Sequence, residues 1–154
     1  MSATVTAGAA PIRHAGLIAA RIGGYWRGVL LEGPSGAGKS SLALRALDHG
    51  FRLVADDRVI LWVCGGRLFG RAPDVLLGLL EVRGLGVVTA PALPLAEIGL
   101  LARCGTPERL PDPRTEQLLG VEVPRVEVDP HQSAAPAGLR RALTHFDEPF
   151  KRRI

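Results

Sequence analysis

Hydrophobic positions along the chain alternate between two patterns, which together predict strands interleaved with helices. Short apolar runs at residues 28–31 and 52–55 are bounded by charged residues, glycine or aspartate, as is typical of buried strands. Between them, apolar residues recur at helical spacing over residues 42–47, and Gly50 follows as a helix terminator. The order strand, loop, helix, strand predicts the α/β class.

Two hairpins frame this unit. A strand over residues 13–20 is expected to precede strand 28–31 through a turn at Gly23 and Gly24. The clearest hairpin joins residues 58–63 to residues 67–71 through Gly65-Gly66. A helix over residues 73–81 is expected next.

The remaining chain predicts further short elements. Arg83-Gly84-Leu85-Gly86 reads as a loop, residues 107–113 as an irregular connection and residues 115–119 as a short helix. Residues 121–128 alternate as a strand, and residues 139–146 have helical spacing. The expected organisation is one domain over residues 11–147, with a frayed tail at residues 1–10 and a loose basic end at residues 148–154.

Composition fits one globular domain in a reducing compartment. Of the 154 residues, 47% are apolar and 22% charged, which argues against a fibre or wholesale disorder. Cys64 and Cys104 are too few and too far apart for a disulfide framework or zinc site, so we expect a cytoplasmic protein with both thiols buried. We find no signal peptide pattern, and charges and prolines interrupt the most apolar region, which predicts no membrane association.

The basic charge is spread rather than clustered. The net charge is +4, carried by 17 arginines and the two lysines Lys39 and Lys151. The arginines are scattered and do not alternate with aromatic residues, so we expect an acidic ligand and no nucleic acid partner.

One stretch carries specific chemistry. It follows the apolar run 28–31, precedes the predicted helix and reads G-x-x-x-x-G-K-[ST]. Its residues are Gly33, Pro34, Ser35, Gly36, Ala37, Gly38, Lys39 and Ser40. Such a loop turns backbone N–H groups toward phosphate oxygens at a helix N-terminus, while the lysine neutralises phosphate charge and the serine binds Mg²⁺. We therefore predict a nucleotide and Mg²⁺ as ligands, whereas a simple glycine turn would need no lysine.

Three carboxylates are candidates to complete the site. Asp56 and Asp57 end the strand that follows the loop helix, where they can reach a bound Mg²⁺ or an incoming hydroxyl. Glu81 precedes Arg83 and can supply a metal ligand or hold that arginine. The alternative interpretations are a turn at the aspartates and a helix cap before Gly84.

Four blocks in order resemble the catalytic domain of the HPr kinase/phosphorylase family. They are HAGL at residues 14–17, GPSGAGKS at 33–40, RLVADD at 52–57 and EVRGLG at 81–86. The resemblance implies a P-loop kinase domain with a mixed β-sheet, β-hairpins and flanking helices. It also implies an ATP-dependent enzyme that phosphorylates a serine of the phosphocarrier protein HPr, often with reverse phosphorolysis, and that assembles as a homo-oligomer, a hexamer.

Roles carry over from the family by position. His14, Lys39, Asp56 and Arg109 match active-site residues, with Asp56 as the proton acceptor. Ser40 and Glu81 match Mg²⁺ ligands, and Asp57, Arg83, Gly84 and Gly86 match supporting positions in the motifs.

Three departures distinguish this chain from longer family members. We expect no counterpart of their N-terminal domain, Ser41 replaces a common acidic residue, and DPHQS at residues 129–133 stands where a Pro-Gly-Arg-Asn-type loop is expected. The last departure argues for weak or absent phosphorolysis. Two other interpretations stay open: a small nucleotide or metabolite kinase, because GPSGAGKS also resembles guanylate kinases, and an ATP-binding regulator without catalysis.

Overall fold

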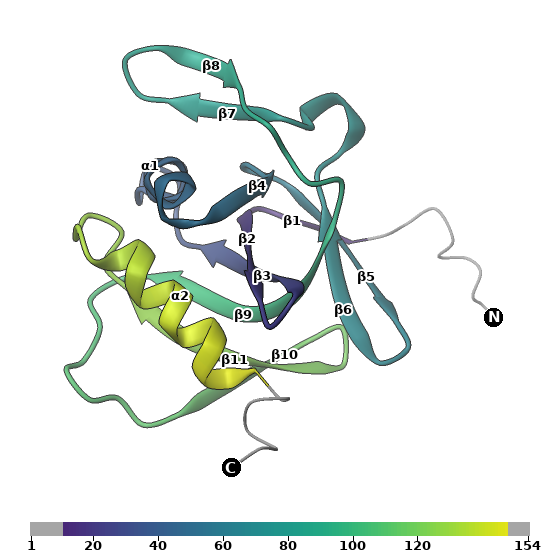
Figure 1. The fold of residues 1–154 in the computed structure, drawn as a ribbon, viewed down its shortest axis with the longest axis vertical. Helices are drawn as coiled ribbons and strands as arrows, with labels where there is room; N and C mark the ends of the chain where they lie inside the picture. The colour runs from purple at the N-terminus through teal and green to yellow at the C-terminus, as the bar shows by residue number, and fades with distance from the viewer. Residues whose placement is uncertain (1–10, 148–154) are drawn as a thin grey trace.

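The computed structural model describes residues 11–147, so the predicted tails at 1–10 and 148–154 lie outside the described residues. Figure 1 shows a curled sheet with two helices against one face and a small hairpin above them. The strands are β1 (Ile12–Arg13), β2 (Gly16–Ile22), β3 (Tyr25–Glu32), β4 (Phe51–Ala55), β5 (Val59–Cys64), β6 (Arg67–Arg71), β7 (Leu79–Val82), β8 (Gly86–Thr89), β9 (Ala96–Cys104), β10 (Arg114–Leu118) and β11 (Val121–Val128). The helices are α1 (Lys39–Ala46) and α2 (Ala135–Phe146), with 3₁₀ turns at Leu47–His49 and Asp74–Leu76.

The main sheet is mixed, as the family resemblance implies. Its order is β1-β5-β6-β9-β3-β2-β4, and β11 adds to β9 while pairing with β10. β3 and β9 are parallel, as are β9 and β11, whereas the other pairs are antiparallel. The phosphate loop therefore leaves the end of β3, a strand that is paired on both sides.

Both faces of the sheet centre are buried. In β2, Ile18 and Ala20 enter the cluster beneath the helices, while Leu17 and Ala19 enter a second cluster on the opposite face. This alternation follows from the two-residue period of a strand. In β9 the register against β3 shifts at Gly99, so the alternation resumes one residue later.

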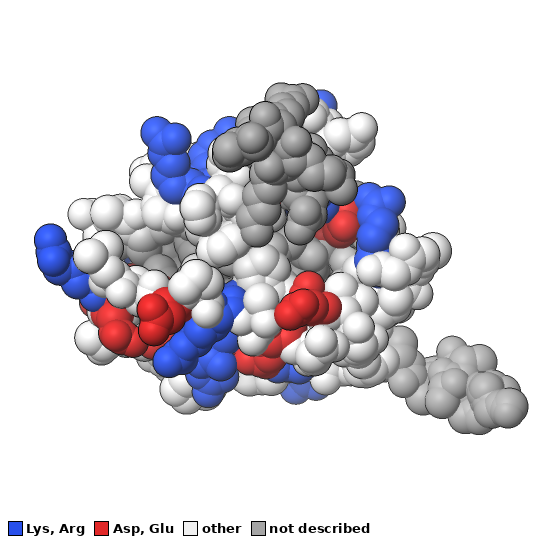
Figure 2. Space-filling model, turned by 90° about the horizontal axis from the view of Figure 1, so that it is seen from below, with Lys and Arg blue, Asp and Glu red and all other residues white. Residues whose placement is uncertain are grey.

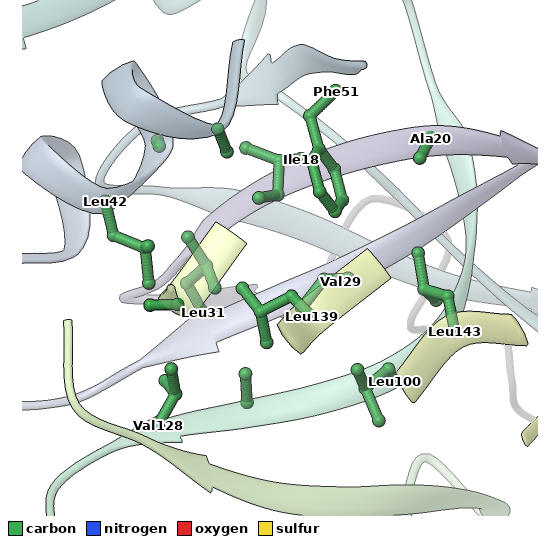
Figure 3. Packing of buried hydrophobic residues seen from close by; sticks show 14 of the residues in the cluster. Ile18, Ala20, Val29, Leu31, Leu42, Phe51, Leu100, Val128, Leu139 and Leu143 are labelled. Atoms are coloured by element: carbon green, nitrogen blue, oxygen red, sulfur yellow. The ribbon is translucent and has the colours of Figure 1, made fainter. Parts of the chain in front are cut away.

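The two helices cover the same face. Figure 3 shows Leu42 of α1 and Leu139 and Leu143 of α2 pointing toward Leu31 and neighbouring strand residues. The helical stripe at residues 42–47 is thus explained by burial against the sheet. Helix α2 begins at Ala135, four residues before its predicted start.

The predicted helix over residues 73–81 is wrong. A 3₁₀ turn at Asp74–Leu76 is followed by β7, which pairs with β8 in a separate two-stranded sheet. Leu80 is buried in the cluster beneath α1, whereas the next residue, Glu81, is exposed. Alternate side chains of the strand face the core here. The apolar run was compatible with either a helix or a strand, and tertiary packing selects the strand.

The short helix predicted at residues 115–119 is also wrong. Those residues form most of β10, which pairs antiparallel with β11 through a turn at Leu119 and Gly120. The prediction of buried thiols fails as well, because Cys64 is exposed and Cys104 is only half-buried. By contrast, the hairpins at Gly23-Gly24 and Gly65-Gly66 and strand 121–128 are confirmed.

Surface charges of opposite sign lie side by side. Figure 2, seen from below the view of Figure 1, shows acidic side chains beside basic ones. Arg125 pairs with Glu116 at 3.1 Å, and Glu97 pairs with both Arg27 and Arg67. Within residues 11–147, no helix is long and apolar enough to cross a membrane.

Candidate active site

The phosphate loop has the predicted strand, loop and helix context. β3 ends at Glu32, and α1 starts at Lys39 after the glycine-rich turn. Gly36 and Gly38 have φ values of 82° and 109°, a left-handed backbone that glycine adopts without strain. This conformation belongs to turns in which successive N–H groups face one concave side, next to the positive end of a helix. The loop therefore fits a phosphate group.

Lys39 is held against the loop. Its side chain is buried, and Nζ donates to the carbonyl oxygens of Gly33 at 2.6 Å and Pro34 at 3.2 Å. These bonds satisfy an ammonium that would otherwise be costly to bury. They also fix the charge beside the turn where phosphates would lie.

Asp56 connects three segments of the candidate site. Its Oδ1 accepts a hydrogen bond from the Ser40 hydroxyl at 2.7 Å, and its Oδ2 accepts one from the backbone N–H of Glu81 at 3.0 Å. The carboxylate at the end of β4 is thereby fixed between the first turn of α1 and strand β7. Hydroxyl and carboxylate oxygens are hard ligands that Mg²⁺ accepts, so this pair suits the metal.

Asp57 faces a different group. Its backbone is left-handed, with φ 74°, and not extended as the sequence suggested. Its carbonyl accepts a bond from the N–H of Ala15 at 3.1 Å, and its Oδ1 lies 3.4 Å from Nε2 of His14. Arg58 lies 3.7 Å from the other carboxylate oxygen. The structure thus joins His14, between β1 and β2, to the end of β4.

Other predicted residues are less closely joined. The Glu81 side chain is exposed, and its backbone alone contacts Asp56. Arg83 and Gly84 lie in the β7–β8 turn, and Gly86 begins β8. Arg109 is exposed in the segment between β9 and β10, and within residues 11–147 no ion pair or side-chain hydrogen bond joins it to the other predicted residues.

Sequence reasoning missed a buried carboxylate next to the loop. Glu32 is only 6% exposed, pairs with Arg13, the neighbour of His14, and lies 3.9 Å from Arg103. Because Glu32 directly precedes Gly33, these contacts hold the foot of the phosphate loop to β1 and β9. The sequence offered one signal for Glu32: it is a charged residue directly after the apolar run 28–31, which was predicted to be buried.

Sequence reasoning also missed the packing of residues 129–133, called here the 129–133 loop. A Cβ placed on Gly38 would lie 3.0 Å from Cε1 of His131 and 3.3 Å from Pro130. Arg45 of α1 donates to the carbonyls of Pro130 and Gln132. No local sequence pattern reports a contact between segments about ninety residues apart.

The half-buried Cys104 lies on the other side of the loop. A Cβ on Gly33 would lie 3.0 Å from Cys104 Cβ and 3.6 Å from its Sγ. Burial raises the pKa of the Cys104 thiol above its ordinary value, against the opposing influence of the Lys39 and Arg103 charges. The thiol is therefore a neutral packing group at the foot of the loop.

Ser40 and Asp56 form a small set of possible metal ligands. Within residues 11–147, no three His, Cys, Asp or Glu side chains are grouped to hold a metal ion. Mg²⁺ at phosphate sites is typically held by one or two protein groups together with phosphates and water. Ser40 and Asp56 meet that lower requirement.

A surface cavity of about 340 Å³ lies beside His14. Its lining includes Arg13, Leu61 and Leu118. A larger depression of about 570 Å³ lies along the last turns of α2 and contains none of the predicted site residues. The first cavity is therefore the one that adjoins the candidate site.

Known proteins resemble this chain over the segment that contains the phosphate loop. The profile of the HPr Serine kinase C-terminal domain matches residues 13–93. HPr kinase/phosphorylase from Clostridium tetani is 49% identical over 69 residues, which are 45% of this chain and 23% of that protein. The same-named protein from Streptococcus thermophilus is 47% identical over 70 residues, again 45% and 23%. The matched segment thus spans about a quarter of these curated relatives.

A solved structure extends the likeness to almost the whole fold. The Hpr(Ser) kinase/phosphatase from Coxiella burnetii superposes with a TM-score of 0.72 and 27% identity, covering 94% of this chain and 99% of that one. The matched profile covers more than half of the chain and contains the phosphate loop, both aspartates and the β7–β8 turn. The chain therefore belongs to the HPr Serine kinase C-terminal domain family.

Proposed function

We propose that this chain is a Mg²⁺-dependent kinase that transfers the γ-phosphoryl group of ATP to a serine of HPr in the cytoplasm. The observation that carries the proposal is the 2.7 Å bond between Ser40, in the phosphate loop, and Asp56, at the end of β4. It brings a predicted metal ligand and a predicted proton acceptor together from separate motifs. The names of the relatives support HPr as the acceptor.

Each residue has a physical task in this proposal. The N–H groups of the phosphate loop bind and orient the phosphates, and Lys39 offsets charge on the transferred group. Ser40 and Asp56 would hold Mg²⁺, which when bound screens phosphate charge, and the exposed Glu81 is proposed as a further ligand. Asp56 accepts the proton of the attacking serine hydroxyl, and the bond from Glu81 N–H fixes its carboxylate.

Two further residues are proposed on the acceptor side. His14 and Asp57 lie 3.4 Å apart beside the cavity next to β1, so we place the incoming protein loop there. Arg109 is proposed to offset phosphate charge, on the family resemblance alone. Arg109→Ala should lower transfer without changing ATP affinity if the arginine acts only when the acceptor is bound.

The direct test is phosphoryl transfer. The purified chain, labelled ATP, Mg²⁺ and HPr from the same genome should yield phosphoserine on HPr, and an HPr variant with alanine at the acceptor serine should stay unlabelled. Lys39→Ala is the matched enzyme control. Absence of transfer across varied conditions would reject the proposal, and label on GMP without a protein acceptor would favour a small nucleotide kinase. ATP binding without transfer to any acceptor would favour a regulator.

Reverse phosphorolysis is proposed to be weak or absent. The 129–133 loop has DPHQS where the family pattern expects a Pro-Gly-Arg-Asn-type loop. Incubation of phosphoserine-HPr with inorganic phosphate should therefore release little pyrophosphate compared with forward turnover. Comparable rates in both directions would contradict this.

Self-association is also proposed from the family resemblance, as a hexamer. Light scattering at working concentration should give a mass near six chains. A clean monomer would refute it.

A further inference from the structure

The 129–133 loop forms a second wall beside the phosphate loop. His131 and Pro130 lie against Gly38, the residue directly before α1. A Cβ placed on Gly38 would lie 3.0 Å from His131 and 3.3 Å from Pro130. These positions belong to the segment that the matched profile does not reach. Neither the phosphate-loop motif nor the matched profile therefore assigns a role to the 129–133 loop.

The backbone of this wall is fixed. Arg45 of α1 donates to the carbonyls of Pro130 and Gln132, the latter at 3.1 Å. Asp129 Oδ1 accepts the N–H of His131 at 3.0 Å, and its carbonyl accepts the N–H of Gln132 at 3.2 Å. The position of His131 is therefore set through its main chain.

The imidazole itself has no assigned partner. The residue is exposed, and within residues 11–147 neither ring nitrogen makes a hydrogen bond or ion pair. The atom nearest Gly38 is Cε1, which lies between the two ring nitrogens. A nitrogen that can donate is thus present directly beside the phosphate loop.

The charge of the proposed ligand calls for such a donor. Lys39 is the only Lys or Arg in residues 33–40, and its Nζ is engaged with two loop carbonyls. A Mg²⁺-bound triphosphate remains anionic, so further donors around it are stabilising. Two charged side chains at the 129–133 loop already bond its backbone: Arg45 of α1 and Asp129 of the loop itself.

We infer that His131 donates a hydrogen bond to the phosphates of the bound nucleotide, as a second side-chain contact beside Lys39. The inference rests on the proposed function for its ligand, ATP. It makes the 129–133 loop part of the binding site.

Nucleotide affinity provides the test, independently of catalysis. Calorimetric titration of the full chain with Mg²⁺-ATP should show that His131→Ala raises Kd roughly 3- to 10-fold, as expected for a solvent-exposed polar contact to a charged group. His131→Gln, which keeps an N–H donor, should recover part of the loss. His145→Ala is the matched control. His131 precedes α2, whereas His145 lies in the last turn of that helix, against Phe146.

Tripolyphosphate separates phosphate contact from nucleoside contact. It should displace a fluorescent ATP analogue, and His131→Ala should weaken it by the same factor as ATP. Unchanged ATP affinity in His131→Ala, an equal loss in His145→Ala, or tripolyphosphate affinity that is absent or insensitive to His131→Ala would each overturn the inference. The inference would also be overturned if the nucleotide-free His131→Ala variant melted at so low a temperature that partial unfolding explained the lost affinity.

These outcomes are distinct from those of the proposed function. Loss of affinity in His131→Ala together with no phosphorylation of HPr would sustain the nucleotide contact and reject the kinase assignment. Transfer to HPr with a His131→Ala variant of normal affinity would do the reverse.

Discussion

Residues 13–93 and residues 94–147 contribute differently to the same site. The first region holds the matched profile, the phosphate loop, both aspartates and the β7–β8 hairpin. The second supplies β9 and β11, which lie parallel to β3, and α2, which covers the sheet beside α1. Most residues proposed for phosphoryl transfer lie in the first region, whereas the support of the loop comes from both.

The regions meet at the phosphate loop. β9 ends at Cys104, which lies against Gly33, and the 129–133 loop lies against Gly38. Changes in the first region should therefore alter transfer most. Apart from Arg109 and His131, changes in the second region should alter mainly stability.

The largest effect is expected at Asp56. Asp56→Asn removes the proposed base but keeps the shape of the side chain and an amide oxygen that can still bind Mg²⁺. Transfer should therefore fall about 10²- to 10⁴-fold, while ATP affinity stays near normal. Single-turnover phosphorylation of HPr and calorimetric ATP binding measure the two quantities.

Asp57→Asn is the matched control, because this neighbour faces His14 and not Ser40. Its effect on transfer should be clearly smaller. If Asp56→Asn transfers at the wild-type rate and Asp57→Asn does not, the assigned roles are exchanged.

A second prediction concerns the support given by α2. Leu139 is buried against the cluster beneath the helices (Figure 3), so Leu139→Ala should lower the free energy of unfolding by about 2–5 kcal/mol. Denaturant titration measures this loss. Among molecules that remain folded at low temperature, kcat for transfer should stay within about twofold, and a larger fall would show that α2 also shapes the chemistry.

The sequence predicted elements with strong local signals in both regions, and one predicted helix failed in each. Strand, phosphate loop and helix at residues 28–47 carry strong local signals, and hairpin 58–71 has a glycine turn between alternating runs. Residues 73–81 and 115–119 failed because short apolar or polar runs fit either helix or strand, and pairing with β8 and β11 decided between them.

The candidate site was predictable where its residues belong to a motif. The bond between Ser40 and Asp56 joins two motifs, and its partners were both named in advance. Glu32 and His131 were missed because their roles depend on packing between distant segments. The structure also leaves the Glu81 side chain and Arg109 unpaired with the other predicted residues, so their assignments depend on family resemblance.

A third prediction compares the two thiols. Cys64 is exposed at the end of β5, whereas Cys104 is half-buried and burial raises the pKa of its thiol. The raised pKa lowers the reactive thiolate fraction of Cys104, and burial limits access to its sulfur. Iodoacetamide should therefore modify the exposed Cys64 faster, on the order of tenfold at pH 8. Mass spectrometry of Cys64→Ser and Cys104→Ser proteins reads each thiol separately, and equal rates would contradict the prediction.

The smallest predicted effect tests an ion pair that joins the regions, that of Glu97 in β9 with Arg27 in β3 and Arg67 in β6. Burial raises the pKa of Glu97, but the hydrogen bond from Arg67 and the charge of Arg27 outweigh it, so the pKa lies below its ordinary value. Such a carboxylate stabilises the fold above its unfolded-state pKa, and this contribution is lost as pH falls through the folded-state pKa. Glu97→Gln should therefore cost no more than about 1 kcal/mol near pH 7, because solvent screens the pair, and the difference from wild type should shrink below about pH 4. Thermal melts across pH measure the stability difference between Glu97→Gln and wild type. Glu108→Gln, at an exposed position in the same region, is the control. A difference that grows in acid would show that the ion pair does not stabilise the contact between β3, β6 and β9.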